Sequence, residues 1–125
     1  MNRRGNPRQR FAVLGGRHEF EVLALEQSQE SFTLHYSVTP PLPDDQAPLA
    51  QPVYMWLEAV DDLGNQYTDF GGARGMSPDG SRTEGSLSGR PAVPSDSRSL
   101  TVRLVFMNGT DESGYDLTIP LPSES

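Results

Sequence analysis

Alternation of apolar and polar side chains at every second residue is the dominant pattern of this chain. It is clearest in SFTLHYSVT (31–39), SLTVRLVF (99–106) and GYDLTIPL (114–121). This period is typical of a β-strand that buries one face and leaves the other in water. Each of these segments is therefore predicted to form a half-buried strand. The segment VYMWLEAV (53–60) is apolar at both parities, which predicts a more central strand.

Four further segments bring the expected number of strands to about eight. They are RFAVL (10–14), EFEVLALE (19–26), QYTDF (66–70) and TEGSLSG (83–89). No window shows a helical period, and most of the 11 Pro and 12 Gly fall between the strands. Short strands separated by turn signals favour an antiparallel architecture. The predicted fold is all-β, an immunoglobulin-like antiparallel β-sandwich of seven to eight strands.

The expected core is made of the apolar residues at the inward positions of these strands. They are Phe20, Val22, Phe32, Leu34, Tyr36, Val38, Leu57, Leu100, Val102, Leu104 and Phe106.

Two segments are predicted to be long loops. Residues 39–52 contain five prolines, which makes this segment stiff. Residues 71–82 are rich in glycine. Binding residues on β-scaffolds are concentrated in loops, so a site is expected there or on an exposed sheet face or edge.

The stretch DDLGNQYTDF (61–70) has two interpretations. Asp61, Asp62, Asn65 and Asp69 offer oxygen ligands, which raises the possibility of calcium, but their spacing does not match an EF-hand. The alternative is a hairpin in which Asp61 accepts hydrogen bonds from the turn amides and Gly64 is left-handed. Turn chemistry favours the hairpin, and calcium binding stays an open alternative.

Charge is divided unevenly along the chain. Residues 1–18 contain five Arg and no acidic residue, whereas residues 19–125 contain five Arg and all 17 acidic residues. Residues 1–18 are therefore predicted to be a basic, flexible N-terminal arm and residues 19–125 a single domain. The excess of acidic residues in 19–125 disfavours binding of nucleic acid, because phosphates are bound by cationic faces.

Several classes of protein are disfavoured by composition. Cysteine is absent, which excludes disulfides, thiolate metal sites and cysteine nucleophiles. No apolar run reaches the length of a membrane span, so no membrane insertion is predicted. A cytoplasmic location follows if Met1 is the native start, and a cell-envelope location follows if a signal or anchor was removed.

Three residues are candidates for binding. Tyr54 and Trp56 would form an aromatic platform for a sugar if their face is exposed, although a sandwich strand more often places one such residue in the core. Arg74 would grip a carboxylate or phosphate, unless it is simply a solvated loop residue. No phosphate-binding loop or nucleophile elbow is complete. No catalytic residue, metal or cofactor is predicted.

Three stretches carry a resemblance to a known class of domain: EFEVLALEQSQESFTLHYSVTPP, VYMWLEAVDDLGNQYTDFGG and GSLSGRPAVPSDSRSLTVRLVF. The shared features are a strand that ends in a D-x-G-x-x-Y hairpin (Asp62, Gly64, Tyr67), a glycine-rich strand and the segment PSDSRSLTVRL before a late strand. The chain resembles small bacterial, often actinobacterial, immunoglobulin-like β-sandwiches and telokin-like domains of envelope or anti-sigma proteins. The resemblance covers about residues 19–121 and implies a domain without enzymatic activity that mediates interactions or acts as a spacer.

The sequence thus favours a non-catalytic protein-interaction or accessory module. The alternative is a sandwich that binds a small ligand or carbohydrate through Tyr54, Trp56 and Arg74. A hydrolase with an unusual carboxylate site is a third and weaker interpretation, because the required motifs are missing. The partner and the oligomeric state are not encoded in any recognisable motif.

Overall fold

Eight β-strands make up the regular structure of this chain in a computed structural model that describes residues 9–42 and 53–121. The all-β prediction and its strand number are confirmed. Within the described residues there is no helix long and apolar enough to cross a membrane. The strands are β1 (Arg10–Val13), β2 (His18–Gln27), β3 (Phe32–Thr39), β4 (Val53–Asp61), β5 (Gln66–Met76), β6 (Thr83–Arg90), β7 (Ser99–Asn108) and β8 (Asp111–Pro120).

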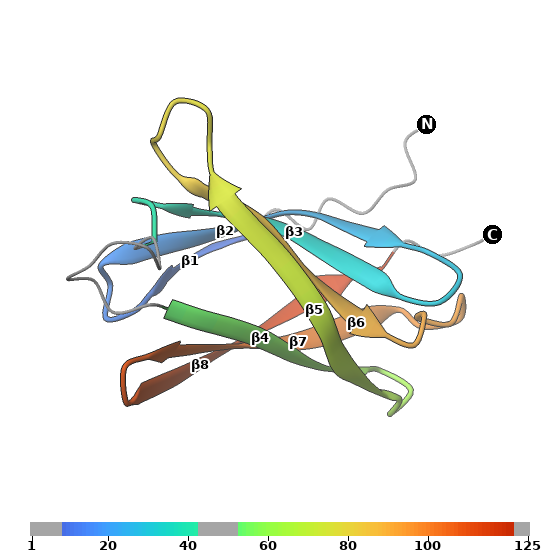
Figure 1. The fold of residues 1–125 in the computed structure, drawn as a ribbon. Coiled ribbons are helices and arrows are strands. Elements are labelled where there is room, and N and C mark those ends of the chain that lie inside the picture. The colour runs from blue at the N-terminus through green and yellow to red at the C-terminus, as the bar shows by residue number, and fades with distance from the viewer. Residues whose placement is uncertain (1–8, 43–52, 122–125) are drawn as a thin grey trace.

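The strands form one hydrogen-bonded series in the order β1-β2-β3-β6-β5-β4-β7-β8, with every neighbouring pair antiparallel. Figure 1 shows β5 and β6 running obliquely between the group β1–β3 and the group β4, β7 and β8. The two ends of the series approach each other, since Leu14 N donates to the Tyr115 hydroxyl at 2.9 Å and Gln9 Nε2 to Thr118 O at 2.8 Å. The sheet is therefore nearly barrel-shaped.

β5 is the strand at which the sheet changes direction. Its first residues pair with β4 at two positions only, Ala59 with Tyr67 and Val60 with Gln66. From Thr68 onward β5 pairs with β6, and a bulge interrupts that ladder between Asp69 and Gly71. Because β5 follows β6 from there, β4 and β5 separate after their shared hairpin.

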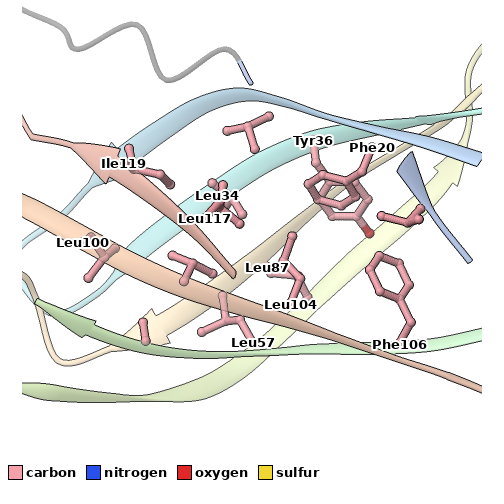
Figure 2. Packing of buried hydrophobic residues seen from close by; sticks show 14 of the residues in the cluster. Phe20, Leu34, Tyr36, Leu57, Leu87, Leu100, Leu104, Phe106, Leu117 and Ile119 are labelled. Atoms are coloured by element: carbon pink, nitrogen blue, oxygen red, sulfur yellow. The ribbon is translucent and has the colours of Figure 1, made fainter. Parts of the chain in front are cut away.

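The core lies between the two groups of strands, as Figure 2 shows for Phe20, Tyr36 and Phe106 among others. Every residue expected in the core is buried. Phe20 of β2 stacks on Tyr36 of the neighbouring β3 with ring centroids 4.9 Å apart, and it meets Phe106 of β7 edge-on at 6.1 Å. Alternation alone was sufficient for this prediction, because an inward position on the sheet is shielded from water whichever strand lies opposite.

Two expected boundaries differ from the structure. Residues 71–82 were expected to be a long loop, but β5 continues to Met76, and only 77–82 form a turn, closed by the bond from Ser77 N to Arg82 O at 2.9 Å. This part of the strand is rich in glycine, which has no side chain, so it lacks the alternation of apolar and polar residues that predicts a strand. The range expected to be an N-terminal arm includes β1, so the sheet begins at Arg10. Residues 1–8 and most of the proline-rich segment 39–52 lie outside the described residues.

Candidate functional site

The turn between β4 and β5 is organised by one buried carboxylate, that of Asp61. Its Oδ1 accepts hydrogen bonds from Leu63 N and Asn65 N, both at 2.9 Å. Its Oδ2 accepts from Asn65 Nδ2 at 2.9 Å, from the Tyr67 hydroxyl at 2.7 Å and from Ser97 Oγ at 2.8 Å. Gly64 has a φ of 89°, the left-handed conformation that this turn requires. The hairpin interpretation is confirmed.

The four residues considered for calcium do not converge on one point. Asp62 Oδ1 accepts from Arg98 N at 2.9 Å, and Asp69 accepts from Leu57 N at 3.0 Å and Gly71 N at 2.8 Å. The Asn65 side chain donates rather than accepts. Over residues 9–42 and 53–121, no group of three His, Cys, Asp or Glu is arranged to hold a metal ion. These oxygens serve the backbone of the hairpin and its neighbours.

The charge of Asp61 is stabilised by its neighbours. Burial of this carboxyl favours the neutral form, but the hydrogen bonds from the surrounding N–H and O–H donors outweigh burial and hold the pKa of Asp61 well below its usual range. The pKa of Tyr67 is raised by burial and by its bond to Asp61. The arrangement stabilises the turn, because each oxygen of the buried Asp61 carboxylate accepts more than one hydrogen bond.

Tyr54 and Trp56 lie side by side on the outer face of β4. They are two residues apart, so a strand directs both to the same side, away from Val53 and Leu57, which face the core. Tyr54 is 62% exposed and Trp56 is half-buried. The expectation that one of the pair joins the core is wrong, because residues two apart on a strand point to the same side of the sheet.

A small apolar patch surrounds Trp56 on this outer face. On the neighbouring strand β7, Val105 is the register partner of Trp56, and Met107 is the register partner of Tyr54. Val105 points away from the core, between Leu104 and Phe106 that point into it, yet it is only 4% exposed and lies outside the core cluster. Neighbours on the outer face therefore cover it. We call Tyr54, Trp56, Val105 and Met107 the outer patch.

A depression of about 490 Å³ lies on the β4, β7 and β8 side of the sheet, towards the hairpin. Glu58, Arg103 and Asp116 line it, together with Gln66 and other residues of the hairpin. Glu58 and Arg103 are register partners, and Arg103 Nε lies 3.9 Å from Asp116 Oδ1. The outer patch thus has charged groups of both signs beside it.

Arg74 belongs to β5, and its side chain extends from β5 towards β4. The register row that joins Tyr36, Gly85 and Arg74 points inward, because Tyr36 belongs to the core. The Arg74 guanidinium donates to Val53 O across the separation between the two strands. A hollow of about 240 Å³, the β4–β5 hollow, is lined by Tyr36, Met55, Tyr54 and Arg74, among others.

The structure therefore divides the three candidate binding residues. Tyr54 borders the β4–β5 hollow and also belongs to the outer patch, Trp56 belongs to the outer patch, and Arg74 belongs to the hollow. Met55 and Tyr36 could not be predicted as residues of the hollow, because both have the pattern of ordinary strand residues. Arg74 on a glycine-rich strand was the available signal, since a partly buried charged side chain needs a polar partner.

Comparison of the chain with protein-family models, with curated proteins and with solved structures found no match in any of the three.

Proposed function

We propose that this protein is a non-catalytic module that binds a partner protein through the outer patch. The observation that carries the proposal is the position of Trp56 beside Tyr54 on a sheet face that has no part in the core. Trp and Tyr are concentrated in the energetically dominant centres of protein interfaces. Met107 adds a flexible apolar contact beside them.

Charge favours a partner with a cationic rim. The part of the chain after residue 18 carries 17 acidic and five basic residues. Glu58 is exposed on β4, and Glu112 and Asp116 are exposed on β8, the strand beside β7. A cationic partner would be attracted at long range and then bury the aromatic centre. Arg103, which is paired in register with both Glu58 and Asp116, moderates this acidity locally.

The immunoglobulin-like, telokin-like relationship is part of this proposal. The eight antiparallel strands and the β4–β5 hairpin built on Asp61, Gly64 and Tyr67 support it. The hairpin differs from the quoted motif in one respect, since Tyr67 binds Asp61 rather than Asp62.

The test is affinity capture from a lysate of the source organism with three baits: the wild type, Trp56→Arg and Leu63→Arg. Leu63 is the matched control, because it is 51% exposed but lies in the hairpin turn, outside the outer patch. A protein retained by the wild type and by Leu63→Arg, and lost with Trp56→Arg, supports the proposal. Equal retention by all three baits contradicts it.

The basic N-terminus needs its own bait. A deletion of residues 1–8 leaves β1 intact, whereas a deletion to residue 18 would remove that strand from the sheet. A partner that is lost only on deletion of 1–8 would place the interaction in the Arg-rich segment and contradict the role of the outer patch.

A carbohydrate ligand is the second candidate function. The depression lined by Glu58, Arg103 and Asp116 favours it, because hydrogen-bonding side chains beside an aromatic ring are the usual components of a sugar site. Trp56 is the only tryptophan, so its fluorescence reports this face alone. A saturable change of emission with an oligosaccharide supports a sugar site, and a spectrum unchanged across neutral and acidic oligosaccharides contradicts it.

A further inference from the structure

The separation of β4 and β5 leaves part of the β4 backbone without β5 beside it. Leu57 N bonds to the Asp69 carboxylate, and Val53 O bonds to the Arg74 guanidinium, so both backbone groups face β5. Backbone groups of alternate residues in a strand point to the same side. The N–H and C=O of Met55 therefore also face β5, between these two side-chain bonds.

No strand pairs with Met55 on that side within the described residues, because the β4–β5 ladder ends at Ala59 and Tyr67. Met55 also lines the β4–β5 hollow. A backbone donor and acceptor thus border a hollow, in the position where a neighbouring strand would otherwise bind them. Such groups are under-satisfied unless water or a ligand bonds to them.

Arg74 supplies a positive charge to the same hollow. A guanidinium has five N–H donors, and the recorded bond to Val53 O uses one of them. Among the residues that the structure describes, no carboxylate forms an ion pair with Arg74. Asp69 also lines the hollow, but its two oxygens accept from Leu57 N and Gly71 N. The Arg74 charge therefore has no anionic partner of its own in this part of the molecule.

The remaining wall of the hollow suits a short organic group. Tyr36 contributes a phenol, Leu87 and Val53 contribute apolar surface, and Gly72 brings the β5 backbone close. Burial raises the pKa of Tyr36, and the charge of Arg74 opposes that shift, which places the phenol within the field of the guanidinium. The phenol stays protonated at neutral pH and is available as a donor.

We propose that the β4–β5 hollow binds a carboxylate that has an amide group next to it, as in an N-acylated amino acid or the C-terminus of a peptide. The carboxylate pairs with the free N–H donors of Arg74, and the adjacent amide bonds to the N–H and C=O of Met55. The ligand thereby forms with Met55 the backbone hydrogen bonds that a paired strand would have formed there.

A carboxylate fits this hollow better than a phosphate does. A guanidinium edge matches the planar carboxylate with two parallel bonds. A phosphate near neutral pH carries close to two negative charges. The second charge would lie near the Asp69 carboxylate, and Arg74 is the one cation among the described residues that line the hollow. The volume of about 240 Å³ accommodates an end group rather than a long chain segment.

The binding test uses two-dimensional amide NMR spectra of the full chain at constant ionic strength with three probes. N-acetylglycine has both groups, N-acetylglycine amide lacks the carboxylate, and propionate lacks the amide. We expect saturable shifts centred on Met55, Gly72 and Arg74 with N-acetylglycine. Each of the other probes is expected to bind about tenfold more weakly, the loss typical of one charge-assisted or buried hydrogen bond.

Two variants assign the site. Arg74→Gln is expected to abolish the shifts, and Arg98→Gln is the matched control, because Arg98 is exposed and lies outside the hollow. If Arg74→Gln does not fold, Arg74→Lys and the comparison of the three probes on the wild type still test the proposal. A lysine keeps the positive charge but lacks the paired N–H donors of a guanidinium.

Longer peptides identify the source of the ligand. Tighter binding of a hexapeptide with a free C-terminus than of N-acetylglycine indicates a protein C-terminus, and equal binding indicates a free small acid; both support the proposal. Absence of saturable shifts with N-acetylglycine, or equal shifts with its amide, overturns it. The outer patch and the hollow share Tyr54, but Trp56 does not line the hollow, so Trp56→Arg and Arg74→Gln test the two proposals separately.

Discussion

The Tyr67 hydroxyl donates a 2.7 Å hydrogen bond to Asp61, and this bond closes the β4–β5 hairpin from within. Ser97 bonds to the same Asp61 oxygen at 2.8 Å from the segment before β7, 36 residues further along the chain. One carboxylate therefore ties the hairpin to the strand that pairs with β4 on its other side. β4 and β5 diverge after the pair Ala59–Tyr67. The hydrogen bonds to Asp61 therefore hold the two strands together at the end from which the β4–β5 hollow opens.

Asp61→Asn is expected to lower the free energy of unfolding at neutral pH by about 2–4 kcal/mol, because several buried donors lose a charged acceptor. The measurement is urea-induced unfolding followed by circular dichroism. Asp116→Asn is the control and is expected to change stability by no more than about 0.5 kcal/mol, since its carboxylate is exposed and its ion pair is long, at 3.9 Å. Equal losses for both variants would contradict the role given to Asp61.

Acid is expected to remove the stabilisation that Asp61 provides. The pKa of Asp61 is lower in the folded than in the unfolded chain, where it is about 3.9. Its contribution is therefore complete above about pH 4 and is lost as the pH falls towards the folded-state pKa. The difference in unfolding free energy between wild type and Asp61→Asn should shrink below pH 4. A difference that stays constant down to strongly acidic pH would show that the carboxylate charge is not what stabilises the turn.

Two adjacent residues of β4 are expected to respond very differently to truncation. Leu57→Ala removes a side chain that is 1% exposed in the core and should cost about 2–5 kcal/mol. Trp56→Ala acts on the outer face, where burial is partial, and should cost about 1 kcal/mol. Denaturant midpoints of the two variants test this difference. A loss for Trp56→Ala as large as that for Leu57→Ala would place the indole in the core.

Two glycines of the β5–β6 ladder form a second matched pair. A Cβ at Gly89 would lie 2.4 Å from the Phe32 ring, whereas a Cβ at Gly75 would meet nothing within 4 Å. Gly89→Ala should destabilise by about 1–3 kcal/mol through overpacking. Gly75→Ala should be neutral or stabilise by up to about 1 kcal/mol, because it restricts the unfolded chain. Thermal unfolding of the two variants measures the contrast, and equal midpoints would show that the Phe32 ring moves aside freely.

Acrylamide quenching of Trp56 tests its surroundings directly. The indole is half-buried on the outer face, so we expect quenching between that of a free and a fully shielded tryptophan. Replacement of Val105 by Ala should increase the quenching, because Val105 is the cross-strand neighbour of the indole. Unchanged quenching in that variant would show that the indole is covered from elsewhere.

Strand positions and the core were predictable from the sequence because they depend on a local property. An inward-facing residue such as Leu34 or Val102 must be apolar wherever its strand pairs, so alternation identifies it without knowledge of the neighbours. The hairpin at Asp61 was predictable for a similar reason, since Asp and Gly at those positions fulfil requirements of the turn itself. The longer extent of β5 was missed because Gly71, Gly72 and Gly75 have no side chain that could alternate.

Residue patterns along the chain were enough to predict an all-β protein with about eight strands, an apolar face on most of them and a tight turn after β4. The strand order, the near closure of β1 onto β8 and the separation of Trp56 from Arg74 became known only from the fold. These features depend on which strands pair and where a ladder ends. Pairing brings together residues far apart in the chain, and alternation along one strand carries no information about the strand beside it.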